Sequence, residues 1–248
     1  MIISKDNKFI SHINKLNASK KYRHSHNQTV LETEHSILDT LQHFPSQISY
    51  IVTTSQHKTL INKAEALNIK TYLCDETVIN YCAYVKHSQG CLAVIDMPQW
   101  SLENTDYNFV LALFNINNPS NLGSILRNAH AFGCDAIFKI GHSCDSLHPD
   151  CIRASSGNVF SVPIHCLQEE QSMHILKKFT CWILDIKAKT TLAEIPSTEK
   201  MCFIFGSETG LKTPLHTITN RCKIPIKSTV DSLNVAATSA IVLHQFLK

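Results

Sequence analysis

Four predominantly apolar runs in the second half of the chain constrain the fold more than any other feature of the sequence. They are Phe109–Asn115, Ala136–Ile140, Trp182–Ile186 and Met201–Phe205. Strands with one face in solvent alternate apolar and polar residues, whereas strands of a parallel sheet are covered on both faces and form continuous apolar runs. The runs therefore predict an α/β fold built on a parallel sheet.

Segments with helical spacing separate these runs. Apolar residues recur on one helical face in Asn121–Phe132, and a final helix is predicted at about Leu233–Leu247. Helices that alternate with buried strands cover both faces of the sheet. Such sheets bind ligands at the carboxyl ends of their strands, so functional residues are expected there.

The first half of the chain predicts a separate, smaller α/β domain. Its expected elements are helices at Phe9–Leu16, His35–His43 and Lys58–Leu67, and strands at Thr29–Leu31, Tyr50–Val52, Thr71–Leu73 and Cys91–Ile95. Residues Met97–Asp106 carry Pro98 and break the apolar periodicity, which favours a linker. The sequence thus predicts a domain at 1–97, a linker at 98–106 and a second domain at 107–248.

The composition is that of a soluble protein with reduced thiols. No apolar stretch approaches the ~20 residues that a membrane-spanning helix needs. The first residues lack the layout of a signal peptide, so a cytoplasmic location is expected. The chain has 10 cysteines but no C-x-x-C pair, which disfavours a structural zinc site, and no metal is expected.

Positive charge is concentrated near the N-terminus, although the net charge of only +3 identifies no polyanionic partner by itself. The cations of this segment are Lys5, Lys8, Lys15, Lys20, Lys21 and Arg23. Tyr22 lies among them, and cations mixed with rings are typical of surfaces that track RNA phosphates. A solvated, charged helix fits the same composition, so both interpretations stay open at this point.

Three segments fall where the parallel strands are expected to end. The first is N-I-N-N-P-S-N-L-G-S-I-L-R, from Asn115 to Arg127. Asn121 is predicted to cap a helix, and Gly123 leaves the first turn of that helix uncovered. Free backbone N–H groups beside the Arg127 guanidinium favour a phosphate. Taken alone, Arg127 is an exposed helical arginine.

The second and third segments follow later apolar strands. In F-I-F-G-S-E-T-G-L, Gly206 and Gly210 flank Glu208, so a ligand can approach the main chain closely. In I-P-I-K-S-T-V-D-S-L-N-V-A, from Ile224, polar Ser232 and Asn234 stand at the start of the final helix. A strand-to-helix turn with a surface glutamate and a capped helix start are the plain structural interpretations.

All three segments, in this order, resemble the signature motifs of the SpoU/TrmH family of RNA ribose 2′-O-methyltransferases, which belong to the SPOUT superfamily. The matching stretches are N-P-S-N-L-G-S-I-L-R-N-A-H-A-F-G, F-G-S-E-T-G-L and I-P-I-K-S-T-V-D-S-L-N-V-A. R-A-S-S-G-N-V-F-S-V-P at Arg153–Pro163 also resembles the family pattern. The resemblance implies S-adenosylmethionine as methyl donor, a deep trefoil knot near the C-terminus and a homodimer.

The resemblance also implies roles for single residues. The donor is expected to be held by main chain near Gly206, Ile224, Ile226 and Leu233. The pocket is expected to be ordered by Asn121, Glu208, Ser232 and Asn234, with Arg127 at the reacting hydroxyl. Two departures are a spacing from Glu208 to Gly210 that is one residue shorter than in many members, and Ile226 where methionine is common.

The first half resembles the ribosomal-protein-like RNA-binding domain that many members carry. K-K-Y-R at Lys20–Arg23 and S-Q-G-C-L-A-V at Ser88–Val94 carry that resemblance, whereas V-L-E-T-E at Val30–Glu34 lacks the glycine that usually follows the glutamate. Lys20, Lys21 and Arg23 are therefore expected to contact RNA, with ribosomal RNA the preferred substrate and transfer RNA the second choice.

Two other functions remain to be weighed. A catalytically silent RNA-binding relative is disfavoured because the polar motif residues are present together. A nucleotide-binding oxidoreductase is disfavoured because the sequence has no G-x-G-x-x-G fingerprint. Binding of S-adenosylmethionine or of NAD separates the two enzyme classes.

Overall fold

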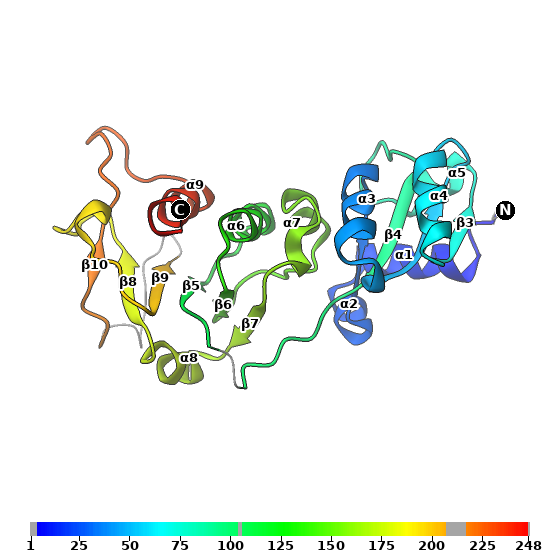
Figure 1. Ribbon diagram of the computed structural model, residues 1–248. Coiled ribbons are helices and arrows are strands. Elements are labelled where there is room, and N and C mark those ends of the chain that lie inside the picture. The colour runs from blue at the N-terminus through cyan, green and yellow to red at the C-terminus, as the bar shows by residue number, and fades with distance from the viewer. Residues whose placement is uncertain (1–3, 104–105, 207–216, 248) are drawn as a thin grey trace. The chain divides into compact units, whose positions relative to one another are not determined.

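The computed structural model describes residues 4–103, 106–206 and 217–247 (Figure 1). Contacts divide the chain into two compact units. Unit 1 comprises Met1–Gln99 and Asp145–Phe160, and unit 2 comprises Trp100–Cys144 and Ser161–Lys248. The predicted second domain at 107–248 differs from unit 2 in two respects. Unit 2 begins at Trp100, inside the predicted linker, and residues 145–160 pack with the N-terminal part of the chain.

Unit 1 is built on a four-stranded sheet in the order β1-β4-β2-β3. Its strands are β1 (Gln28–Leu31), β2 (Ile48–Thr53), β3 (Thr71–Leu73) and β4 (Cys91–Asp96). Strand β4 runs antiparallel to β1 and β2, and β2 runs parallel to β3. The helices are α1 (Lys8–Ala18), α2 (Lys20–His26), α3 (Glu34–His43), α4 (Lys58–Ala66), α5 (Glu76–Cys82) and α7 (Pro149–Ala154), with short 3-10 turns at Pro45–Gln47 and Asn158–Phe160.

The core of unit 1 forms where amphipathic helices cover this sheet. Ile10, Ile13 and Leu16 recur on one face of α1 and are fully buried. They pack in one cluster with side chains of α5 and of strands β1, β2 and β4. The segment 145–160 joins unit 1 through α7, which packs on β1, and through the Thr29 hydroxyl, which donates to the Leu147 carbonyl at 3.0 Å.

Unit 2 confirms the predicted parallel sheet. Among its described residues, six strands lie in the order β10-β8-β9-β5-β6-β7, and every neighbouring pair is parallel. The strands are β5 (Phe109–Phe114), β6 (Ala136–Ile140), β7 (Ile164–Leu167), β8 (Thr180–Leu184), β9 (Met201–Phe205) and β10 (Arg221–Cys222). The other elements are α6 (Pro119–Phe132), α8 (Glu169–Leu176), α9 (Val235–Phe246) and a 3-10 turn at Leu192–Glu194.

Both faces of the central strands are covered, which explains their continuous apolar sequence. Val110, Ala112 and Phe114 of β5 face a cluster that includes Leu176 of α8. On the other face, the ring of Phe246 in α9 lies 4.9 Å from the ring of Phe203. Helices α6 and α9 pack side by side in that layer (Figure 1). Helices therefore cover both faces of the sheet, and a ligand can reach it at the ends of its strands.

Within the described ranges, the structure contains no helix that is long and apolar enough to cross a membrane. No disulfide joins any of the cysteines in the described ranges, and most of them are buried. Burial raises the pKa of the thiols of Cys82, Cys91 and Cys222 to about 12 in each case. These thiols therefore pack as small apolar side chains.

Candidate active site

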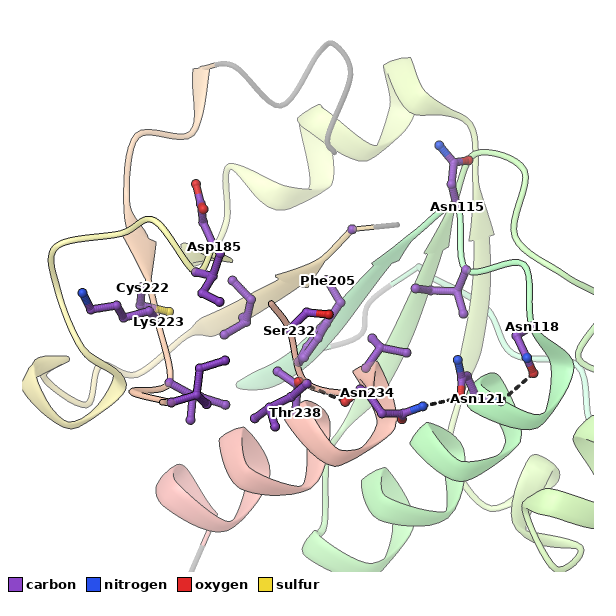
Figure 2. Close-up of a pocket in the computed structure, with 18 of the residues that line it drawn as sticks. Asn115, Asn118, Asn121, Asp185, Phe205, Cys222, Lys223, Ser232, Asn234 and Thr238 are labelled. Atoms are coloured by element: carbon purple, nitrogen blue, oxygen red, sulfur yellow. Dashed lines mark hydrogen bonds between the residues drawn. The ribbon is translucent and has the colours of Figure 1, made fainter. Parts of the chain in front are cut away.

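A pocket of about 750 Å³ opens at the carboxyl ends of the parallel strands of unit 2 (Figure 2). Its wall begins where strands β5, β8, β9 and β10 end, and it continues over the N-terminal ends of α6 and α9. The strands end at one edge because they are in register, with Leu113 of β5 opposite Phe205 of β9. The fold therefore places the pocket where sequence reasoning expected functional residues.

Most of the predicted site residues line this pocket. They are Asn121, Gly206, Ile224, Ile226, Ser232, Leu233 and Asn234. They come from three segments that are far apart in the sequence, and the fold of unit 2 brings these segments together. Glu208 and Gly210 lie outside the described residues.

The start of α6 corrects the predicted cap. Helix α6 begins at Pro119, and Asn118 rather than Asn121 caps it. The Asn118 Oδ1 accepts hydrogen bonds from the backbone N–H groups of Ser120 at 2.9 Å and Asn121 at 3.2 Å. Proline suits the first helical position because it has no N–H to satisfy there. The Asn121 side chain is therefore free for another contact.

That contact joins the ends of two helices. The Asn234 Nδ2 donates to the Asn121 Oδ1 at 3.1 Å, across 113 positions of sequence (Figure 2). The Asn234 Oδ1 accepts from the Ala236 N–H at 2.8 Å and so caps α9. Helix α9 therefore begins at Val235, two residues later than predicted, and Ser232 and Leu233 stay in the loop before it. One asparagine thus fixes α9 and the polar wall of the pocket together.

Asn115 adds to this amide-rich wall. Its backbone has a φ of +54°, in the left-handed region that asparagine tolerates better than most residues. Its Oδ1 accepts from the His142 N–H at 2.8 Å. A Cβ on Gly141 would lie 2.6 Å from this oxygen, so glycine is required there. The turn after β6 therefore holds the Asn115 side chain in place.

Sequence reasoning missed two charged residues of the pocket lining, Asp185 and Lys223. The Asp185 carboxylate accepts from the Arg221 Nη1 at 3.1 Å and from the Lys187 N–H at 2.9 Å. Asp185 was placed inside the predicted strand Trp182–Ile186, but β8 ends at Leu184. A correct strand end would have put Asp185 with the other residues at the sheet edge (Figure 2).

Comparison with known proteins decides the family. A model of the SpoU rRNA Methylase family matches residues 108–244, which is more than half of the chain. The chain belongs to this SpoU family. The match contains all three motif segments and every residue of the pocket lining.

Individual SpoU relatives extend the match into unit 1. An uncharacterized tRNA/rRNA methyltransferase of Synechocystis sp. is 31% identical over 75% of this chain and 70% of its own length. The 23S rRNA (guanosine(2553)-2′-O)-methyltransferase RlmP of Bacillus subtilis is 25% identical over 91% of each chain. The crystal structure of an AdoMet-bound rRNA methyltransferase from Sinorhizobium meliloti superposes with a TM-score of 0.84 at 22% identity, over 98% of this chain and 95% of that one. This last likeness shows that the SpoU chain has the same fold.

The structure places Arg127 on α6, outside the pocket lining. The residue is exposed, and within the part of the chain that the structure describes its side chain has no hydrogen bond or ion pair. Its predicted role at the hydroxyl therefore stays a prediction. No residue of the described ranges holds its guanidinium, which is therefore open to a partner on that side.

The three cations predicted to contact RNA separate into two kinds. Lys20 and Lys21 are exposed on α2. Arg23 is only 3% exposed, and its guanidinium donates to the Asp145 Oδ2 at 2.8 Å and 3.0 Å and to the Leu16 carbonyl at 2.7 Å. The prediction that Arg23 contacts RNA is wrong, because these partners inside unit 1 use its donors. Arg23 instead ties α1 and α2 to the segment 145–160.

Asp145 is the other half of this buried pair. Burial alone would raise the pKa of its carboxyl, but hydrogen bonds from Arg23 and the Leu147 N–H outweigh burial and lower the pKa. The exposed His24 ring also lies 2.9 Å from the Asp145 Oδ1. Asp145 is therefore charged at neutral pH and needs its partners.

Within the described ranges, the structure holds no group of three or more His, Cys, Asp or Glu side chains that could bind a metal ion. The charged side chains that line the pocket there are Asp185 and Lys223. Its other polar atoms come from amides, hydroxyls and the main chain. Such a lining is suited to holding and orienting a ligand by hydrogen bonds.

Proposed function

We propose that this chain transfers a methyl group from S-adenosylmethionine to a ribose 2′-hydroxyl of ribosomal RNA. One observation carries the proposal: three motif segments of the SpoU family form a single pocket at the carboxyl edge of the sheet. The name of the Bacillus subtilis relative, which matches 91% of the chain, supports ribosomal RNA and the 2′-oxygen.

The pocket fits the methyl donor in size and lining. Ligand pockets of about 300–1,000 Å³ hold molecules of this class, and this pocket measures about 750 Å³. Phe205, Ile224 and Ile226 offer apolar surface to an adenine ring. Asp185 and Lys223 offer charges of both signs to the ribose hydroxyls and the amino-acid end. We assign main chain near Gly206, Ile224, Ile226 and Leu233 to hold the donor.

The residues of this chain act mainly by positioning. S-adenosylmethionine supplies an activated methyl group, whereas a ribose hydroxyl is a weak nucleophile at neutral pH. Alignment of the two reacting atoms can lower a barrier by roughly 7–11 kcal/mol in good cases. The hydrogen bond between Asn121 and Asn234 fixes the pocket wall for this purpose, and Ser232 and Glu208 are assigned to the same ordering role.

Arg127 is assigned to the RNA side of the reaction. A guanidinium keeps its proton in proteins, so it is unsuited to act as a general base. Its planar fork can grip a phosphate and direct one N–H at the neighbouring hydroxyl. The exposed position on α6 is consistent with a partner that approaches from solvent.

We further propose the deep trefoil knot of the family for unit 2. After the edge strand β10 the chain lines the pocket through Ile224 and Ile226, and α9 then packs against α6, which follows the inner strand β5. This return path supports a knot. A crystal structure of the donor-bound chain, traced continuously through residues 200–235, tests it.

A homodimer is proposed as well. Ile241 of α9 is 41% exposed and Val230 of the preceding loop 44%, and a second copy that covered them would remove this apolar surface from water. Sedimentation equilibrium of the full chain distinguishes a dimer from a monomer.

Unit 1 is proposed as the ribosomal-protein-like RNA-binding domain, with Lys20 and Lys21 at the phosphates.

The decisive experiment is methyl transfer with purified components. Full-length protein, S-adenosylmethionine with a labelled methyl group and unmodified 23S rRNA should give RNA labelled on a ribose. Unmodified transfer RNA is the matched substrate control. Label in transfer RNA alone would contradict the proposed substrate, and label in neither RNA would contradict the activity.

A further inference from the structure

A second cavity, of about 440 Å³, lies within unit 1. It is bounded by the end of β1, the start of α3, the segment after α5, and α7. Val30, Leu31 and Ile152 give it apolar surface, and the polar atoms of Ser36 and Ser156 stand beside them. Such a mixed lining suits a small ligand with apolar faces and polar edges.

Tyr84 is held firmly at this cavity although its side chain faces solvent. The residue lines the cavity and is 41% exposed. Its backbone N–H donates to the Glu32 Oε1 at 2.6 Å, and its hydroxyl donates to the Asp150 Oδ2 at 3.1 Å. A ring that is fixed at both ends loses little conformational entropy when a ligand stacks on it.

The same carboxylate positions a cation beside the ring. The Asp150 Oδ1 accepts from the Arg153 Nη2 at 3.1 Å, and the Arg153 side chain is still 59% exposed. His35 and His87 also line the cavity and are exposed. Their side chains have no hydrogen bond or ion pair in the described parts of the chain. The cavity thus combines the exposed ring of Tyr84 with the exposed polar groups of Arg153, His35 and His87.

An uncommon turn closes one wall of this cavity. Ser156 and Gly157 both have positive φ angles, of +52° and +84°. A Cβ on Gly157 would lie 3.2 Å from the Cβ of Ser36, so the turn brings α7 unusually close to α3. These residues belong to the R-A-S-S-G-N-V-F segment, to which the proposed methyl transfer assigns no role. The left-handed turn therefore shapes the cavity, because it holds α7 against α3.

We propose that this cavity binds one unpaired nucleotide of the RNA substrate, with its base stacked on Tyr84 and an adjacent phosphate at Arg153. Rings beside cations are the usual means of holding single-stranded RNA, because every base has a face that stacks. The inference rests on the proposed function, since it takes RNA as the ligand. It adds to unit 1 a contact with a base, where Lys20 and Lys21 provide contacts with phosphates.

The first test compares two exposed tyrosines of unit 1 in the full chain. The probe is a fluorescein-labelled single-stranded RNA of about 12 nucleotides, and fluorescence anisotropy measures its affinity. Tyr84→Ala should weaken binding about tenfold, and Tyr84→Trp should preserve it. Tyr81 is 47% exposed but does not line the cavity, so Tyr81→Ala is the matched control and should bind as the wild type does. Equal affinities for the two alanine variants would overturn the proposal.

The second test uses exposed residues of the cavity, whose replacement should disturb the fold little. The His87 side chain has no hydrogen bond or ion pair with any described residue, so His87→Ala should keep the wild-type unfolding midpoint while weakening RNA binding by about threefold. Arg153→Gln should weaken binding and flatten its salt dependence, whereas Lys63→Gln, at an exposed position of α4, should change neither. Unchanged binding in both cavity variants contradicts the proposal.

Duplex RNA of the same sequence distinguishes base stacking from contact with phosphates alone. Paired bases cannot enter the cavity, so Tyr84→Ala should leave duplex binding unchanged. An equal loss of affinity for duplex and for single-stranded RNA would contradict the nucleotide pocket.

Methyl transfer by the wild-type chain is measured separately. If the wild type methylates 23S rRNA while Tyr84→Ala and Tyr81→Ala bind RNA equally, the cavity inference alone fails. If Tyr84 proves necessary for binding but no methyl is transferred, the proposed activity fails instead.

Discussion

The pocket of unit 2 and the basic helix of unit 1 were both predicted from sequence. Seven of the residues predicted for the pocket line it together, whereas the three cations predicted for the helix do not share one surface. In unit 2, Asn121 and Asn234 stand 113 positions apart and share a hydrogen bond. In unit 1, Lys21 and Arg23 stand two positions apart, yet one is exposed and the other buried. The order of several motifs carries information about tertiary structure, whereas local charge does not say which side of a helix faces the core.

Helix geometry explains the difference within α2. The helix has seven residues, and successive side chains turn by about 100°, so neighbouring cations point in different directions. Arg23 points toward the Leu16 carbonyl and Asp145, whereas Lys20 and Lys21 point to solvent. Asp145 lies 122 positions away, and no pattern near Arg23 could have indicated it.

The largest expected effect is on the free energy of unfolding, where replacing Arg23 should cost far more than replacing Lys21. Arg23→Met leaves the Asp145 carboxylate buried without its main partner, which should lower the free energy of unfolding by about 3–5 kcal/mol. Lys21→Met, its matched control, should change the free energy of unfolding by no more than about 0.5 kcal/mol. Urea denaturation at neutral pH measures both variants.

The loss in Arg23→Met should also depend on pH. In the wild type the pKa of Asp145 is lowered, so its ion pair stabilises the fold above the unfolded pKa of about 3.9 and is lost as the pH falls through the lower, folded value. The difference between wild type and variant should therefore shrink below about pH 4. A difference that stays constant from pH 7 to pH 3 would contradict the buried pair.

The next largest effect concerns Arg127, which the structure leaves outside the pocket lining. Arg127→Ala should lower the single-turnover rate with saturating RNA by at least ~100-fold, because the phosphate and the hydroxyl lose their orienting group. Donor binding and circular dichroism should stay unchanged. Arg127→Lys should recover little, since an ammonium lacks the planar fork.

His130→Ala is the control for that measurement, because His130 is an exposed residue on the same helix. It should transfer methyl at the wild-type rate. If Arg127→Ala does the same, Arg127 is a surface arginine and the pocket works without it.

A smaller effect is expected at the junction of α6 and α9. Asn234→Ala removes the cap of α9 and the hydrogen bond to Asn121, and should cost about 1–2 kcal/mol of stability. Asn234→Asp keeps an acceptor for the cap but loses the amide donor. Asn234→Asp should therefore retain most of the stability of the fold, yet bind S-adenosylmethionine more weakly than the wild type does. Thermal unfolding measures the contribution of the cap, and calorimetry with S-adenosylhomocysteine measures the contribution of the hydrogen bond to Asn121. Equal affinity of wild type and Asn234→Asp for S-adenosylhomocysteine would contradict a role for Asn121 in the pocket.

The smallest effect belongs to the exposed lysines of α2. Replacing Lys20 and Lys21 by glutamine should leave stability unchanged. The slope of log affinity against log salt for single-stranded RNA should become shallower by about 1.4, because two phosphates are no longer neutralised. An unchanged slope would assign both lysines to a solvated helix face with no part in RNA binding.

The sequence predicted strands and helices well where burial was two-sided or strongly periodic. The strands predicted at Ala136–Ile140 and Met201–Phe205 have the bounds found in the structure. It predicted less at element ends, where one residue decides the chemistry. Asp185 was hidden inside an overlong strand, and Asn118 took the capping role predicted for Asn121. The cavity beside Tyr84 could not be predicted, because α7 reaches it from the other half of the chain.

The unit 2 pocket is proposed to be where ribose in ribosomal RNA is methylated. Mass-spectrometric mapping of 23S rRNA, incubated with purified protein and S-adenosylmethionine, tests it most directly. We expect 2′-O-methylation at a defined nucleotide with wild-type protein, and a single-turnover rate at least ~100-fold lower with Arg127→Ala. Methyl groups found on a base, or rRNA that remains unmodified while the protein is folded and binds the donor, would contradict it.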